Sequence, residues 1–359
     1  MRRLAGILLL IGCLPLAGCG TLAYYGQAVS GHLGLMAARE PIDTVMADPA
    51  TPEWVRERLA VVQDAREFAI TELGLPDNGS YTSYVQLERS AVVFNVFAAP
   101  EFSLQPKTWC FPVAGCVVYR GYFDREDAER TAAQYAAEGY DTWVGGAAAY
   151  STLGRFADPV LSTMLYPDDA RLAGVLFHEL AHQQLYVDDD SAFNEAFATT
   201  VEEVGVRRWL GQDGRDAALA EWETRRERAA AFELLLARTR ARLQAIYETE
   251  SPPAEMRADK EAAFAQLEAE YAALKAGWDG WPGYDRWFAA PLNNARLIPS
   301  ATYRGLVPAF RLLLHQADGE LADFYAACGA LAAMPRESRD AEFRRLLAIA
   351  AEPGGDPTR

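Results

Sequence analysis

The chain has 359 residues, half of them hydrophobic, and its 34 basic and 50 acidic side chains give a formal net charge of −16. A chain of this length can bury a substantial core in one large domain or two modest ones. Proteins that bind nucleic acid need a basic surface, so the acidic balance excludes nucleic acid as the expected partner.

Residues 1–18 have the pattern of a bacterial lipoprotein signal peptide. Two arginines precede an apolar run over residues 4–16, which is too short to span a bilayer comfortably. The run ends in Leu16-Ala17-Gly18-Cys19, which resembles a lipobox. We therefore expect cleavage before Cys19 and lipidation of that residue; the alternative is an ordinary secretory signal with a chance cysteine.

Under either interpretation, the mature chain is exported from the cytoplasm. Because Gly20 is not an aspartate, the sorting pattern of such lipoproteins predicts an outer-membrane lipoprotein that faces the periplasm. Residues 19–50 are then expected to form a tether between the membrane anchor and the folded body.

The next part of the chain mixes helices and strands. Thr51-Pro52-Glu53 is a typical helix start, and Gly74 is a typical end. Runs rich in Tyr, Val and Phe predict strands. The expected elements are a helix over 51–73, strands within 81–99 and 109–123, a helix over 124–139 and a strand over 142–150.

From Pro167 onward the pattern is helical. We expect one helix through His182, a second over 191–210, and two charge-rich helices over 213–248 and 254–274. The last two flank Ser251-Pro252-Pro253 and predict an antiparallel hairpin. A solvated helical pair without chemistry is the favoured interpretation of this hairpin, and a docking site for a protein partner is the alternative.

Export also determines how the cysteines are interpreted. After removal of the signal and lipidation of Cys19, three thiols remain: Cys110, Cys116 and Cys328. An oxidising envelope favours a disulfide between Cys110 and Cys116, with Pro112 and Gly115 suited to the turn. A metal site on this pair is the alternative, but no histidine lies nearby in the sequence. Cys328 is expected to be a small buried residue.

The motif that carries chemistry is His178-Glu179-Leu180-Ala181-His182, which uses two of the four histidines in the chain. Residues four apart lie on one face of a helix, so both imidazoles point to a common spot. Zinc accepts neutral imidazole, and Glu179 beside the first ligand can act as general base toward a water molecule. The alternative is two histidines that bind no metal.

A third ligand is needed. The metzincin pattern would require glycine at 185 and histidine at 188, where the chain has Leu185 and Asp188. Without the glycine, Asp188 has no easy turn to bring it back. Glu195 is the better candidate, because it lies in the first turn of the returning helix and can face the imidazoles. Its alternative role is a carboxylate that complements the helix dipole.

The residues after Glu195 extend this hypothesis. Asn194-Glu195-Ala196-Phe197-Ala198 looks like the Asn-Glu-x-x-Ala signature of gluzincins. Thr199 and Glu202 follow one and two turns later on the same face. Either can orient a ligand histidine by accepting a hydrogen bond from the ring nitrogen that does not bind the metal.

The chain resembles the aminopeptidase family of bacterial lipoproteins, which is assigned to the gluzincin zinc peptidases. The residues that carry the resemblance are Trp109-Cys-Phe-Pro-Val-Ala-Gly-Cys116, Tyr119-Arg-Gly-Tyr-Phe123, Tyr150-Ser-Thr-Leu-Gly154, the motif at 178–182 and Asn294-Ala-Arg-Leu. The resemblance implies an α+β fold whose zincin-like catalytic domain contains a mixed sheet and an active-site helix. Its expected parts are the catalytic domain over 51–211 and 276–351, the hairpin insertion over 212–275, the helical C-terminal part and a tail over 352–359.

The resemblance also implies roles for individual residues. His178, His182 and Glu195 would bind zinc, with Glu179 as base. In gluzincins an edge strand binds the substrate backbone, and Gly146, Ala147, Ala148 and Tyr150 would take that role here. The group that would stabilise the oxyanion is not identified; the candidates are Tyr119, Arg120, Tyr150 and Tyr303. An aminopeptidase also needs a carboxylate that binds the free amine of the substrate. Glu88 and Glu101 are both candidates for it.

The sequence thus predicts a membrane-anchored zinc peptidase, an aminopeptidase by its family, acting on peptides in the periplasm. Two alternatives remain at this point. One is an endopeptidase of the same mechanism, and the other is a non-catalytic envelope lipoprotein that binds a partner through its hairpin. Three protein ligands leave a zinc position open for chemistry, which favours an enzyme.

Overall fold

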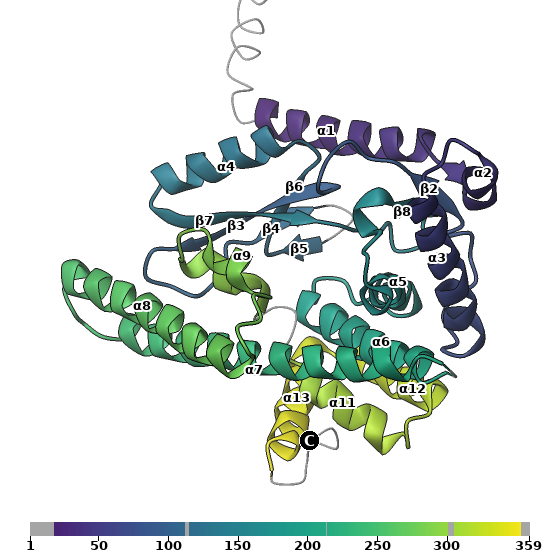
Figure 1. Cartoon of the computed structure of the whole chain (residues 1–359). Helices are drawn as coiled ribbons and strands as arrows, with labels where there is room; N and C mark the ends of the chain where they lie inside the picture. The colour runs from purple at the N-terminus through teal and green to yellow at the C-terminus, as the bar shows by residue number, and fades with distance from the viewer. Residues whose placement is uncertain (1–17, 112–114, 213, 301–304, 353–359) are drawn as a thin grey trace, which may run out of the picture.

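The computed structural model describes residues 18–111, 115–212, 214–300 and 305–352. Numerous helices surround three short sheets, which confirms the α+β class (Figure 1). Nearly all of the expected signal peptide, the tail and Tyr303 lie outside the described residues. Within the described part of the chain, no helix is long and apolar enough to cross a membrane.

The segment expected to be a tether is folded instead. It contains α1 (Gly18–Ala37), β1 (Glu40–Pro41) and α2 (Ile42–Ala47). Leu35, Ile42 and Val45 are buried in the main core. The tether prediction was therefore wrong over most of 19–50, because these apolar side chains find partners in distant parts of the chain.

Two sheets and a small hairpin make up the β structure. The first sheet is mixed: β2 (Ser83–Val85) pairs antiparallel with β1 and parallel with β8 (Val160–Leu161). In the second, β3 (Val93–Pro100) lies between β6 (Arg120–Tyr122) and β7 (Tyr140–Ala147), both antiparallel to it. The hairpin pairs β4 (Trp109–Phe111) with β5 (Gly115–Val117).

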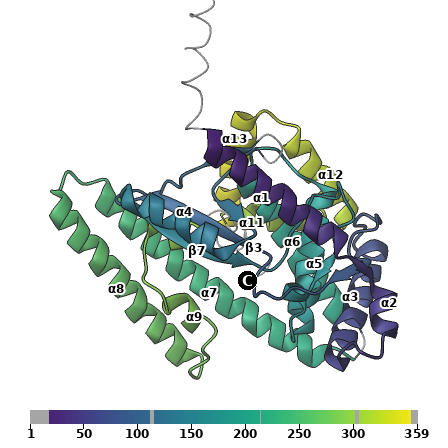
Figure 2. The ribbon, with the colours of Figure 1, turned by 90° about the horizontal axis from the view of Figure 1, so that it is seen from above.

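Helices cover the second sheet. Asp124 caps α4 (Arg125–Ala137) by accepting a hydrogen bond from the Asp127 backbone. Figure 1 shows α4 and α1 along one side of the sheet, and Figure 2 shows the same two helices from above. The Gln27 side chain of α1 bonds both Gly121 O and the N–H of Phe123, so it occupies part of the free edge of β6.

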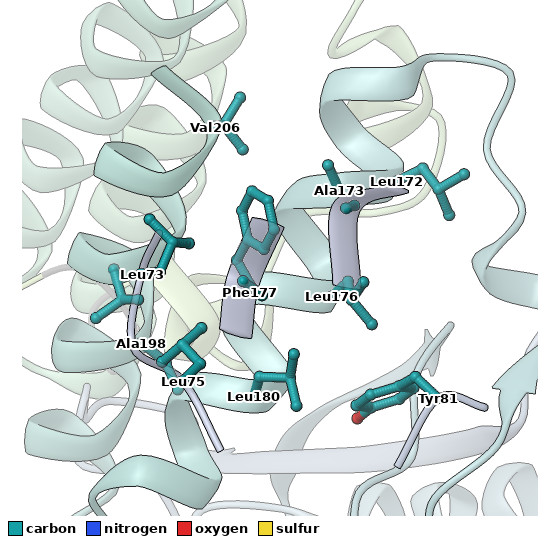
Figure 3. Packing of buried hydrophobic residues seen from close by; sticks show 14 of the residues in the cluster. Leu73, Leu75, Tyr81, Leu172, Ala173, Leu176, Phe177, Leu180, Ala198 and Val206 are labelled. Atoms are coloured by element: carbon teal, nitrogen blue, oxygen red, sulfur yellow. The ribbon is translucent and has the colours of Figure 1, made fainter. Parts of the chain in front are cut away.

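The main core lies between three helices. They are α3 (Glu53–Thr71), α5 (Asp169–Gln184) and α6 (Ser191–Leu210). One face of α5 presents Leu172, Leu176 and Leu180 to this core, and Phe177 points toward Leu73 and Val206 (Figure 3). Apolar residues at this spacing form one stripe of a helix, which fixes how α5 is rotated.

Two glycines allow α5 and α6 to approach closely. A Cβ at Gly205 of α6 would lie 2.8 Å from Phe177, and one at Gly174 of α5 would lie 3.2 Å from Glu202. The N-terminal end of each helix is capped: Asp168 accepts from the backbone of Ala170 at the start of α5, and Asp190 accepts from Phe193 at the start of α6. The helix pair is therefore held in a defined register.

The expected hairpin is present as α7 (Asp216–Tyr247) and α8 (Pro253–Gly277), followed by α9 (Asp285–Phe288) and the short helix η2 (Asn294–Leu297). Polar contacts of α8 join this hairpin to the second sheet. Lys260 of α8 pairs with Asp141 at 2.6 Å and donates to Glu101 O at 2.8 Å.

Asn294 joins the hairpin to the second sheet. The Asn294 side chain accepts from the Tyr247 hydroxyl and donates to Pro100 O and Ser103 O. Asn294 is fully buried, so these hydrogen bonds replace the ones that its amide group would make with water.

The C-terminal helices support α6. They are α11 (Val307–Gln316), α12 (Leu321–Ala332) and α13 (Arg336–Ala350). Phe193 and Phe197 of α6 pack against Phe310 of α11. Cys328 is buried among these helices, as expected, and burial raises its pKa.

Candidate metal centre

Two imidazoles and one carboxylate converge between α5 and α6. Nε2 of His178 lies 3.2 Å from Oε2 of Glu195, and Nε2 of His182 lies 3.8 Å from the same oxygen. Candidate ligand atoms of these three residues all lie within 4.8 Å of one another. They form the one group of this kind found in the described ranges.

The loop between the helices explains why Glu195 returns to this position. Asn194 is buried and makes two hydrogen bonds of 2.8 Å with Val187, one to its N–H and one to its carbonyl. Asp189 takes a left-handed conformation with φ of 62°, which reverses the chain. Asp188 is exposed on this loop and is not part of the convergent group.

Glu202 lies behind His178. Its Oε2 accepts from Nδ1 of His178 at 3.1 Å, which leaves Nε2 of that ring facing Glu195. Thr199 is buried one turn earlier on the same helix. Of the two residues considered as orienting groups, Glu202 is the one that contacts the histidine.

Burial and neighbouring charges shift the pKa values of the site. Burial lowers the pKa of His178, but hydrogen bonds to Glu195 and Glu202 outweigh it and raise the pKa well above its usual range. Burial, together with His178, lowers the pKa of His182 to about 4. Burial raises the pKa of Glu179 to about 7, although His178 acts in the opposite direction. A carboxylate with this pKa can exchange protons near neutral pH.

The donor set fits a zinc ion. Two imidazole nitrogens and a carboxylate oxygen are the ligands of the three-residue zinc sites in hydrolases. The site also gathers Glu179, Glu195 and Glu202 in a largely buried region, where a divalent cation would compensate their charge. Nδ1 of His182 is buried and has no hydrogen-bond partner among the described residues, so only His178 has an orienting group.

Aromatic residues border the group. Electrostatic interactions with Glu195 and Glu179 contribute, after burial, to the raised pKa of Tyr119. The ring of Tyr186, which the sequence analysis did not single out, lies 6.4 Å from that of His182. Its position four residues after His182 was the available signal.

A second residue that sequence reasoning missed is Asp158. It is fully buried and accepts from the hydroxyl and N–H of Thr152. Its charge contributes to the raised pKa values of Glu179 and of the buried Tyr81. No pattern in the sequence marked it, because its role depends on contacts between distant segments.

Other expected site residues have different partners. The hydroxyl of Tyr150 lies 3.4 Å from Nδ1 of His32 in α1. The guanidinium of Arg120 lies over the ring of Tyr24, also in α1. These contacts turn both residues toward α1.

The two carboxylates considered for amine binding are also placed. Both oxygens of Glu101 accept from Arg257 of α8, at 2.7 and 3.0 Å. Glu88 is exposed. Neither carboxylate belongs to the His-His-Glu group.

The expected substrate-binding strand is an edge strand. β7 pairs with β3 on one side only, so its other side is an edge of the sheet. Gly146 and Ala147 lie in β7, whereas Ala148 and Tyr150 follow it. The carbonyl of Ala147 accepts a hydrogen bond from the N–H of Val92, so it points toward β3. Backbone groups alternate in direction along a strand, so those of Val144 and Gly146 point toward the free edge of the sheet.

The cysteine loop contacts the connection between α5 and α6. Cys110 and Cys116 form a disulfide between β4 and β5. The N–H of Cys116 donates to Oδ1 of Asp189 at 2.6 Å. The disulfide hairpin therefore touches the turn that positions Glu195.

This fold and site define an α+β protein with a His-His-Glu group able to hold a metal ion beside a buried carboxylate. A model of the family described as "Putative aminopeptidase" matches residues 23–343. The match covers most of the chain, and the protein belongs to this family, whose description indicates a peptidase. No curated protein and no solved structure shows significant similarity to the chain.

Proposed function

We propose that this protein is a zinc-dependent peptidase of the bacterial envelope, held at the outer membrane by a lipid on Cys19 and hydrolysing peptides in the periplasm. The observation that carries the proposal is the convergence of His178, His182 and Glu195 beside Glu179. Membership of the aminopeptidase family supports peptide hydrolysis.

His178, His182 and Glu195 would hold the metal. Bound zinc supplies a Lewis acid that polarises the scissile carbonyl and makes water a stronger acid. Glu202 keeps the His178 ring in one tautomer and orientation.

Glu179 is the proposed general base. Its burial raises its pKa to about 7, so at neutral pH a large share of the molecules carry a carboxylate of matched basicity. It would accept the proton of the attacking water and return it to the amine that leaves. Tyr119 is the favoured oxyanion donor, because its electrostatic interactions with Glu195 and Glu179 indicate that its hydroxyl lies close to the metal ligands.

The edge of β7 is the proposed peptide-binding strand. Asn293 already donates to the outward carbonyl of Thr142, at 2.9 Å. The outward backbone groups of Val144 and Gly146 follow along the same edge. An extended peptide can add to such an edge through main-chain hydrogen bonds.

Peptide digestion tests this function. Purified protein is incubated with a peptide library whose amino termini are free, and with the same library acetylated. We expect cleavage of free peptides from the amino terminus, and loss of cleavage in Glu179→Gln with zinc content unchanged. Cleavage of both libraries at internal bonds would make the protein an endopeptidase. Zinc bound without any cleavage would favour a non-catalytic lipoprotein.

A further inference from the structure

The outward face of α1 is uncharged and, apart from Ser30, apolar. Charged residues make up 23% of the chain, yet the 20 residues of Gly18–Ala37 include none. Val29 and Leu33 have 57% and 60% of their surface exposed. A Cβ at Gly26 or Gly34 would meet no atom within 4 Å, so these positions face outward too.

The opposite face of α1 is fixed to the protein. Gln27 bonds the backbone of β6 and of Phe123, and a Cβ at Gly31 would overlap the Phe123 ring. Leu35 is buried in the main core. Because these contacts set the rotation of the helix, Val29 and Leu33 cannot turn inward without breaking them.

The apolar surface continues beyond the helix. Phe156 has 54% of its surface exposed, and its ring centroid lies 4.8 Å from that of His32 in α1. Large exposed side chains that adjoin one another mark an interaction surface more strongly than scattered ones do. We call Val29, Leu33 and Phe156 the α1 face.

We propose that the α1 face rests on the lipid bilayer, so that the protein lies on the membrane surface in one orientation. This inference rests on the proposed lipidation of Cys19. That residue lies within α1, so no flexible linker separates the anchor from the helix. Leu33 is 14 residues from Cys19, about 21 Å along a helix, which keeps the whole face near the membrane.

The chemistry of the face suits the proposed occupant. An apolar helix face of this kind can enter the interface between headgroups and acyl chains without crossing the bilayer. The chain carries a net charge of −16 and α1 contains no lysine or arginine, so the helix offers no basic group that would attract anionic lipid. Zwitterionic lipid is the occupant that an uncharged face on an acidic protein fits.

This orientation would direct the metal ligands toward the periplasm. In Figure 1, α1 lies along one side of the molecule, and α5, α6 and the hairpin lie on the other side of the second sheet. The view from above in Figure 2 agrees, with α1 in front of α5 and α6. The helices that carry the metal ligands would then lie on the side of the second sheet that faces away from the membrane.

A fluorescence experiment tests the orientation. Leu33→Cys is labelled with an environment-sensitive dye in the lipidated full-length protein, reconstituted in phosphatidylcholine vesicles with or without brominated acyl chains. Leu234→Cys on α7, whose leucine is 51% exposed, is the matched control. The native thiol of Cys328 is buried, and Cys110 and Cys116 are bridged.

We expect a blue shift and strong bromine quenching at position 33 and neither at position 234. Added phosphatidylglycerol should not increase the quenching. The protein could float with the vesicles while the dyes at positions 33 and 234 show the same emission and quenching. That result would support the lipid anchor and refute the proposed contact between the α1 face and the bilayer. If mass spectrometry of the N-terminal peptide shows no acyl chain on Cys19, the anchor and this inference both fail. Shielding of position 33 without vesicles, rising with protein concentration, would instead identify a second copy as the occupant.

Discussion

Glu202 Oε2 lies 3.1 Å from Nδ1 of His178, and this contact determines which ring nitrogen is available. With Nδ1 engaged, Nε2 faces Glu195 across the helix pair. Gly174 makes room for Glu202 at the crossing of α5 and α6. The packing of two helices thus orients a candidate metal ligand.

Replacing Glu202 should weaken metal binding without removing it. We expect Glu202→Gln to lower zinc affinity about 10- to 100-fold, the range for groups that orient a ligand histidine. Competition with a fluorescent zinc chelator measures the affinity. Glu227→Gln, an exposed carboxylate on α7, is the matched control and should leave affinity unchanged. Equal affinities for both variants would show that the contact with His178 has no role in binding.

The third ligand can be identified by comparing two carboxylates. Glu195 is part of the convergent group, whereas Asp188 is exposed on the loop. Glu195→Ala should therefore reduce zinc affinity far more than Asp188→Ala does. The same chelator competition measures both. The reverse order would refute the proposed ligand set.

Arg339 and Asp190 form an ion pair that supports the start of α6. Their side chains are 6% and 8% exposed, and Nη2 of Arg339 lies 2.8 Å from the aspartate. Arg339→Leu would leave a buried carboxylate unpaired, which we expect to lower the free energy of unfolding by about 3–5 kcal/mol. Urea unfolding measures the change.

A neighbouring arginine provides the control for that prediction. Arg336 is 64% exposed, so Arg336→Leu should change stability by less than about 1 kcal/mol. The double variant Asp190→Asn with Arg339→Leu should be less destabilised than the two single effects combined. Equal losses from both arginine variants would contradict the importance of the buried pair.

The raised pKa of Glu179 predicts how metal-free stability varies with pH. Burial raises its pKa from 4.5 to about 7 in the folded state. Between these values the folded protein binds more protons than the unfolded chain, so the contribution of Glu179 to stability falls as pH rises. The full loss is about 3.5 kcal/mol at most, from roughly 1.4 kcal/mol for each pH unit.

Urea unfolding in EDTA at pH 5 and pH 8 measures this effect. Glu179→Gln cannot ionise, so its stability relative to the wild type should increase between the two pH values. Glu227→Gln should show no such trend. A constant difference between wild type and Glu179→Gln would mean that the carboxylate titrates near its ordinary pKa.

Much of the fold follows from local sequence signals. Asp168, Asp190 and Gly211 mark the ends of α5 and α6 within a residue or two. Proline and charge patterns predict the α7–α8 hairpin. The convergence of Glu195 with the two histidines follows from helix periodicity and one polar turn between helices.

What could not be predicted depends on contacts between distant segments. α1 contains several glycines, which are poor helix formers, and its stability comes from packing on Phe123 and β6. Asp158 reaches the environment of Glu179 only after folding. The strands expected within 81–99 are β2 and β3, but the sequence did not indicate that they belong to two different sheets.

Zinc content measured together with peptide hydrolysis decides whether the protein is a zinc-dependent peptidase. Wild-type protein and Glu179→Gln, dialysed after loading, should each retain one zinc ion per chain by atomic spectroscopy. The double variant His178→Ala with His182→Ala should retain none, and only the wild type should cleave peptides. The account would be contradicted if the wild type retained no zinc, or if Glu179→Gln cleaved peptides at the wild-type rate.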